Sequence, residues 1–174
     1  MSLAAHIRPA KQDDLSELVA MWAQYMRAHA LNPAYRRLRP DALEVKRRQL
    51  ARRIDDATSQ VFVIQRDDDG GLDGMVVCFL EENEPAFYPV RYVRIQTPFV
   101  RRDARRRGNL KRLLQATFEW ARQWEIDEVR LYTGADNLIA NAVADELGFE
   151  AVEVVRRRPL DHVEPELHLE DLLG

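Results

Sequence analysis

Residues 105–114, with the sequence RRRGNLKRLL, place the strongest constraint on what this 174-residue chain can fold into. Upstream, residues 92–100 are rich in β-branched and aromatic side chains and predict a strand. Downstream, residues that recur at helical spacing predict an amphipathic helix. They are Leu110, Leu113, Leu114, Thr117, Phe118 and Ala121. Gly108 therefore lies where a strand and its loop enter the first turn of a helix.

That turn is a candidate anion site built from backbone. The first N–H groups of a helix have no partner within it, and the helix dipole places partial positive charge there. Gly108 lets a phosphate approach the main chain closely, and the neighbouring arginines can add charge-assisted hydrogen bonds. On these residues alone, a solvated basic loop before an ordinary helix start is the alternative.

Before this turn, the sequence predicts an edge strand at residues 6–10 and then a helix with Asp13 or Asp14 as its cap. One face of that helix is apolar. It carries Leu15, Leu18, Val19, Trp22 and Met26. Pro40 and Asp41 open a second helix, so basic that most of its surface should be solvated. Residues 61–65 and 75–80 then predict a β-hairpin around a turn at 67–71.

Pro98 removes a backbone donor from the strand at 92–100, so that strand should be bulged or unpaired there. After the central helix, residues 129–133 predict another strand. Asn137 then opens a helix that Gly148 ends. Its inward residues should be Ile139, Val143 and Leu147. Residues 150–155 and 165–169 are weaker strand candidates. Strands that alternate with helices indicate a mixed α/β sheet.

Residues 100–114, followed by 137–140 and 147–149, resemble the coenzyme A-binding core of the GNAT superfamily of N-acetyltransferases. That family carries Gln/Arg-x-x-Gly-x-Gly/Ala at this turn, and Arg105, Gly108 and Leu110 occupy the three named places. Leu110 departs from the small residue expected. The resemblance implies one GNAT-like α/β domain over residues 1–174. Its sheet would be mixed, mostly antiparallel and flanked by helices, with splayed central strands between which pantetheine inserts.

The resemblance also implies acetyl-coenzyme A as co-substrate. The cofactor-binding residues would be Phe99, Val100, Arg105, Arg106, Arg107, Gly108, Asn109, Leu110 and Asn137. Two other interpretations of the basic stretch stay open, a solvated face and a nucleic-acid site. The acidic pI of about 5.9 and the lack of an aromatic platform argue against nucleic acid. For Asn137, an ordinary helix N-cap is the alternative to a pantetheine contact.

Acetyl transfer needs a neutral amine, a polarised thioester and a thiol that can leave. The family's usual acid, a tyrosine seven residues after Asn137, falls on Ala144, and no carboxylate lies at residues 91–101, where a base would sit. Our candidate acid is Tyr132 and our candidate base is Glu82. Further candidates are Tyr88, Tyr92 and Cys78 as acids and Glu81, Asp136 and His29 as bases.

The predicted function is transfer of an acetyl group from acetyl-coenzyme A to a primary amine of a small molecule or peptide. The missing tyrosine and carboxylate favour one alternative, a catalytically weak acyl-coenzyme A binding or regulatory module. A basic-patch interaction domain that binds neither substrate is another. Residues 25–39 should line the acceptor side. Four of them suit an acceptor with an anionic group: Tyr35, Arg36, Arg37 and Arg39.

Cys78 is the single cysteine, which leaves no intrachain disulfide and no multi-cysteine zinc site. The four histidines show no metal-ligand spacing, so we expect no metal. No apolar run reaches membrane-spanning length, and no charged-then-apolar leader opens the chain. With a net charge of −3, we expect a cytoplasmic protein without membrane or nucleic-acid partners. A homodimer is an open alternative to a monomer.

Overall fold

A computed structural model describes residues 5–35, 37–158 and 160. In this part of the chain one sheet has the strand order β1-β2-β3-β4-β5. Its strands are β1 (Ala5–Pro9), β2 (Ser59–Arg66), β3 (Leu72–Glu82), β4 (Arg91–Val100) and β5 (Val129–Leu131). The first four pair antiparallel, and β5 pairs parallel with β4. The sheet is therefore mixed and mostly antiparallel, as predicted.

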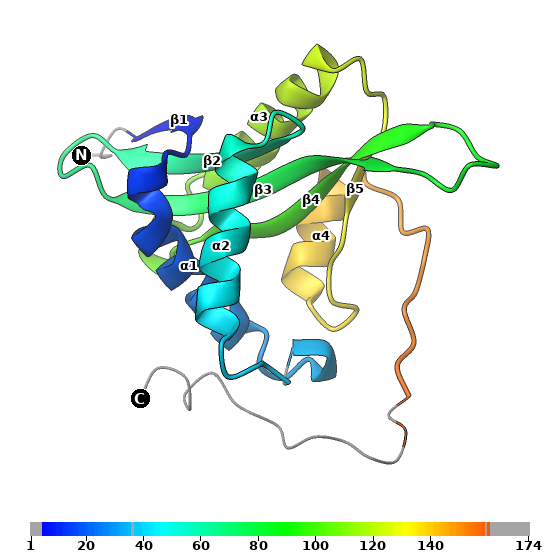
Figure 1. Ribbon diagram of the computed structural model, residues 1–174, viewed down its shortest axis with the longest axis horizontal. Helices are drawn as coiled ribbons and strands as arrows, with labels where there is room; N and C mark the ends of the chain where they lie inside the picture. Colours follow the sequence, from blue (N-terminus) through cyan, green and yellow to red (C-terminus); the bar gives the residue numbers. More distant parts are fainter. Residues whose placement is uncertain (1–4, 36, 159, 161–174) are drawn as a thin grey trace.

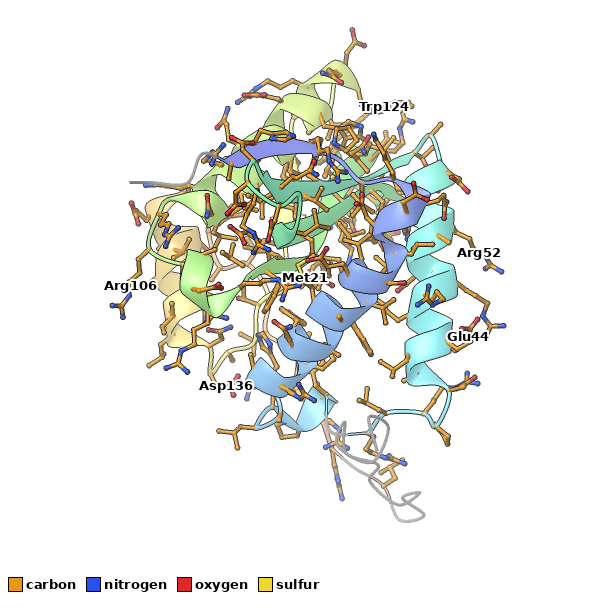
Figure 2. The ribbon with its side chains drawn as sticks, turned by 90° about the vertical axis from the view of Figure 1, so that its left-hand side faces the viewer. Met21, Glu44, Arg52, Arg106, Trp124 and Asp136 are labelled. Atoms are coloured by element: carbon orange, nitrogen blue, oxygen red, sulfur yellow. The ribbon has the colours of Figure 1, made fainter. Side chains whose placement is uncertain are left out.

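Helices cover both faces of this sheet (Figure 1). On one face lie α1 (Leu15–Ala28) and α2 (Ala42–Asp55), and on the other lie α3 (Asn109–Gln123) and α4 (Leu138–Glu146). Side chains alternate between the two faces along β3: Met75 packs toward α1, and Val76 packs toward α3. Met21 of α1 is fully buried against the sheet (Figure 2). Apolar side chains are thus buried on both faces of one sheet, under α1 and α2 on one face and under α3 on the other, which makes a single α/β domain.

The start of α1 is tied to β1 by an ion pair. Asp14 stands at the N-cap position, but its carboxylate makes no cap hydrogen bond. Instead it accepts two hydrogen bonds from Arg8, at 2.7 and 2.9 Å, and one from the backbone N–H of Lys11 at 2.7 Å. These bonds hold the pKa of Asp14 below its usual value, with the Arg8 hydrogen bonds as the largest cause.

The predicted bulge in β4 is present at Pro98. Met75 faces Phe99 and Val77 faces Gln96, so β4 has one extra residue between these two pairs. Thr97, next to Pro98, has a φ of +52°, which is unusual for a β-branched residue. The proline has no N–H to give to the ladder, and the bulge removes the need for one.

Beyond its first half, β4 stays paired with β3 but is no longer paired with β5. The pairs with β5 are Val93–Val129, Arg94–Arg130 and Ile95–Leu131, after which β4 continues to Val100. We call the part of β4 beyond Ile95, together with the chain that leaves β5 after Leu131, the β4–β5 fork. The fork matches the splayed central strands that were expected.

Several local expectations were wrong. The strand expected at 129–133 ends at Leu131. Ile139 is 82% exposed instead of inward, because the first turn of the short α4 extends past its packing partners. Residues 150–155 form no strand, since their apolar alternation has no neighbouring strand to pair with in the described chain. Lys46 is an exception to the solvated surface expected for α2, because it is buried. The strand candidate at 165–169 lies outside the described residues.

Candidate functional site

The turn that joins β4 to α3 has an open backbone face. Gly108, the N-cap of α3, has a φ of +74°, and a Cβ added there would meet nothing within 4 Å. Arg106 also has a positive φ, of 62°. Arg106 and Arg107 are exposed, and Figure 2 shows Arg106 extending away from the molecule. The unpaired N–H groups of the first turn of α3 and the exposed guanidinium groups of Arg106 and Arg107 therefore lie at one helix start, an arrangement suited to binding an anion.

Other residues of the same stretch hold the shape of the turn. The Asn109 side chain is buried, and its Nδ2 donates to the carbonyl of Ala104 at 3.0 Å. Arg105 donates from Nε to the carbonyl of Val100 at 2.9 Å. Leu110 is partly buried and packs into the core between α3 and the sheet. Packing against this core accounts for a leucine at the family's small position.

Asn137 joins two helices that are distant in sequence. Its Oδ1 accepts from the backbone N–H of Ala140 at 3.1 Å, which makes it the N-cap of α4. Its Nδ2 lies 3.1 Å from Nε2 of His29, which follows the end of α1. The other ring nitrogen of His29, Nδ1, lies 2.7 Å from the carbonyl oxygen of Tyr25. A carbonyl only accepts, so the hydrogen is on Nδ1 and the lone pair of Nε2 faces the amide of Asn137.

This link bridges the fork. Helix α1 packs on β4, while Asn137 lies in the connection from β5 to α4. A second contact, between Asn32 and Asp136 at 3.5 Å, runs beside the first, and Figure 2 places Asp136 next to the end of α1. The rings of Tyr25 and Tyr35 lie 4.1 and 5.7 Å from that of His29. Burial, together with Tyr35, raises the pKa of Tyr25.

A polar cluster lies where β4 and β5 part. Arg94 donates to both carboxylate oxygens of Glu81, at 3.1 and 3.2 Å, and lies 4.2 Å from the ring centre of Tyr132. Tyr132 comes directly after Leu131, the last paired residue of β5, and is 44% exposed. Burial, followed by interactions with Glu81 and Tyr132, raises the pKa of Tyr92 to about 12.

A sequence model described as the Acetyltransferase (GNAT) family matches residues 21–149, a range that runs from α1 through the bulge and the Gly108 turn to the end of α4. The chain belongs to the GNAT acetyltransferase family. It is an acetyltransferase, as the resemblance of residues 100–114, 137–140 and 147–149 implied. Among curated protein sequences, none matches this chain significantly.

Solved structures share the fold at low sequence identity. An aminoglycoside antibiotic 6'-N-acetyltransferase from Acinetobacter baumannii has a TM-score of 0.71 and 21% identity, covering 92% of this chain and 100% of that one. A mutant of the BH1408 protein from Bacillus halodurans has a TM-score of 0.78 and 20% identity, covering 89% and 99%. A predicted acetyltransferase from Clostridium acetobutylicum, solved with acetyl-coenzyme A, has a TM-score of 0.75 and 15% identity, covering 92% of this chain and 100% of that one.

The remaining candidate residues of this GNAT chain are dispersed. Glu82 is exposed and faces Arg91 at the hairpin end of β3, several residues from the bulge. Tyr88 is exposed in the loop after β3. Cys78 is fully buried, and burial raises its pKa to about 12. Ala144, at the family's tyrosine place, is buried. Of the acid and base candidates in the described residues, the structure brings His29 and Asp136 together near Asn137, and Glu81, Tyr92 and Tyr132 together where β4 and β5 part.

No group of three or more His, Cys, Asp or Glu side chains in the described part of the chain is placed to hold a metal ion. Within the same residues, no helix is both long enough and apolar enough to cross a membrane.

Proposed function

We propose that this GNAT protein transfers the acetyl group of acetyl-coenzyme A to a primary amine of a small molecule or peptide. The observation that carries the proposal is the β4–β5 fork, which opens after Ile95 and is bridged at its other side by Asn137 and His29. An aminoglycoside N-acetyltransferase of the same fold has been solved with coenzyme A, and also with a bisubstrate analogue that joins coenzyme A to an acetylneamine.

The residues around the fork fit a coenzyme with a long arm and a pyrophosphate. Gly108, Arg106 and Arg107 would receive the pyrophosphate on the open face of the turn. The backbone of Phe99 and Val100, beyond the bulge, would line the pantetheine arm. The other predicted cofactor residues act through the shape of the turn or of the fork. They are Arg105, Asn109, Leu110 and Asn137.

Proton transfer is the chemistry that the side chains must supply. An alkyl ammonium with a pKa of ~10.4 is neutral in only about one molecule in a thousand at pH 7. Nε2 of His29, whose lone pair accepts from the amide of Asn137 in the structure, would exchange that hydrogen bond for one from the acceptor amine and take its proton. The neutral amine nitrogen then bonds to the acetyl carbon, the carbon–sulfur bond breaks, and the thiolate takes a proton from the hydroxyl of Tyr132. The second proton of the nitrogen leaves as the amide forms and restores the hydroxyl of Tyr132, while His29 gives its proton to solvent. Glu82 remains the alternative base, and the link to Asn137 favours His29.

The test is a binding titration with acetyl-coenzyme A followed by a thiol-release assay over a panel of amines. We expect wild-type protein to bind acetyl-coenzyme A and to release thiol only when an amine is present. Gly108→Trp should fold and fail to bind, because the indole would fill the open face of the turn. Binding without thiol release for any amine would support the binding or regulatory module instead. Absence of binding would support the basic-patch interaction domain.

A further inference from the structure

A basic hollow of about 750 Å³ lies along α2 on the α1 side of the sheet. Its apolar lining comes from Trp22, Leu38, Ala42 and Val45. Its cationic lining consists of Arg37, Arg39, Lys46, Arg48, Arg52 and Arg53, against one carboxylate, that of Asp56. Six cations against one anion give the hollow a strongly positive field in a protein whose net charge is −3.

Only half of these cations have carboxylate partners. Arg39 binds Asp41 at 2.9 Å, Arg48 lies 3.7 Å from Glu44, and Arg53 lies 4.0 Å from Asp56. In the part of the chain that the structure describes, no carboxylate lies within 4 Å of the other three. They are Arg37, Lys46 and Arg52. Figure 2 shows Arg52 and Glu44 on the outer side of α2, so Arg52 stands at the rim.

Lys46 is the buried member of the set. It is only 7% exposed, its Nζ donates to Oε1 of Gln49 at 2.8 Å, and it lies 5.7 Å from the ring centre of Trp22. Burial, and then the charge of Arg53, lowers its pKa to about 8. An ammonium group has three N–H donors, and a buried cation without a counter-ion is costly. An anion in the hollow would supply both the missing charge and the missing acceptors.

Side-chain contacts link the lining of the hollow to the fork. Arg53 lies over the ring of Phe79 on β3 at 3.7 Å, and the charges of Glu81 and Arg94 act on it. Arg94 in turn lies against Tyr132, directly after the last β4–β5 pair. A chain of contacts on one face of the sheet therefore connects the basic lining to the place where the acetyl group would be transferred.

We propose that this hollow selects the acceptor, and that the acceptor is a primary amine that carries a carboxylate or phosphate group. The inference rests on the proposed function, because it names the substrate class of the same site. Aminoglycosides, the acceptors for which three of the structurally similar enzymes are named, carry several amino groups and are polycations. A lining of six cations and one carboxylate repels such a molecule and attracts an anionic one.

The experiment compares primary amines of similar size that carry a carboxylate, a phosphate, a hydroxyl or a second amine, with an aminoglycoside as a further arm. We expect the highest kcat/KM for an anionic acceptor, and the carboxylate and phosphate arms decide which anion is preferred. Arg37→Glu and Arg52→Glu should each raise KM for that acceptor about tenfold, with kcat and acetyl-coenzyme A affinity unchanged. The matched variant is Arg122→Glu on α3, which makes the same charge change on the opposite face of the sheet and should leave KM unchanged.

The outcomes separate the two proposals. If wild-type protein acetylates neutral or cationic amines as well as anionic ones, the acceptor inference is overturned while the transferase function stands. Equal effects of Arg52→Glu and Arg122→Glu would also overturn it, since the effect would then come from net charge alone. If no amine releases thiol, the proposed function fails and the acceptor inference fails with it.

Discussion

The side-chain amide nitrogen of Asn137 lies 3.1 Å from Nε2 of His29, while the amide oxygen of the same side chain caps α4 at Ala140. One residue thus performs two tasks with two different atoms. The oxygen stabilises a helix start, and the nitrogen holds an imidazole whose Nδ1 hydrogen is fixed on Tyr25. Because the two tasks use different atoms, substitutions can separate them.

Asn137→Asp should keep the cap and lose the donor to His29. The carboxylate still accepts from Ala140, so we expect the free energy of unfolding to stay within about 0.5 kcal/mol of wild type. Activity should fall, because a carboxylate beside His29 favours the protonated ring, which cannot accept a proton. Asn137→Ala should lose about 1 kcal/mol of stability as well. Urea unfolding and steady-state kinetics of both variants are the measurements, and full activity of Asn137→Asp would contradict the assignment.

His29→Ala should lower kcat/KM about 10²-fold near neutral pH if Nε2 is the base. The loss should shrink as the pH approaches ~10.4, where the acceptor amine is neutral without help. Glu82→Gln serves as the comparison, because Glu82 is exposed at the hairpin end of β3. A pH–rate profile for each variant decides between them. A loss confined to Glu82→Gln would make the glutamate the base.

Gly108→Ala and Gly148→Ala form a matched pair. Both glycines have a positive φ, of 74° and 82°, and a Cβ at either would meet nothing within 4 Å. Each variant should therefore lose about 1 kcal/mol of stability through backbone strain alone. Only Gly108→Ala should weaken acetyl-coenzyme A binding as measured by calorimetry, since only Gly108 belongs to the turn before α3. Equal affinities for the two variants would remove Gly108 from the site.

Tyr132→Phe should lower kcat about tenfold or more when chemistry is rate-limiting, because it removes the hydroxyl proposed to protonate the thiolate. The phenyl ring can keep its place against Arg94, so stability should change little. Tyr92→Phe is the control, since it removes the hydroxyl of a neighbouring tyrosine. The ring of Tyr92 lies 3.8 Å from the guanidinium of Arg130 and can keep that contact in the variant. An unchanged kcat for Tyr132→Phe would mean that the thiolate leaves without this acid.

Lys46→Met should stabilise the protein near pH 7. The pKa of Lys46 is lowered from 10.5 to about 8 in the folded chain. Below pH 8 both the folded and unfolded states carry the proton, so wild type bears the full cost of the buried charge. Between pH 8 and 10.5 only the unfolded state binds it, so wild type gains stability relative to the variant, by about 3 kcal/mol at most. Denaturant unfolding of both proteins from pH 7 to 10.5 measures the difference in their free energies of unfolding. A difference that does not change with pH would contradict the prediction.

Local chemistry made the centre of the fold predictable from sequence. The missing N–H of Pro98 required a bulge, and a glycine between a strand and an amphipathic helix required a turn with an open backbone. The pairing of His29 with Asn137 could not be predicted, because the two lie 108 positions apart and no local pattern relates one to the other. Helical periodicity likewise placed Ile139 inward without showing how far the neighbouring helix extends. The burial of Lys46 followed from how α1 packs on α2, which a basic helix does not reveal.

The short pairing of β4 with β5 has a consequence for the dynamics of the chain. Three residue pairs with β4, and the packing of Leu147 and Phe149 into the core beside α3, hold residues 129–149 to the rest of the sheet, whereas β2 and β3 share long ladders. Backbone amides of β5 and α4 should therefore exchange with deuterium through local opening, well before those of β2 and β3, which require global unfolding. A molecule bound in the fork contacts both β4 and the chain after β5, across their short pairing. Its binding would slow exchange in residues 129–149, so that this segment and the rest of the sheet would open as one cooperative unit.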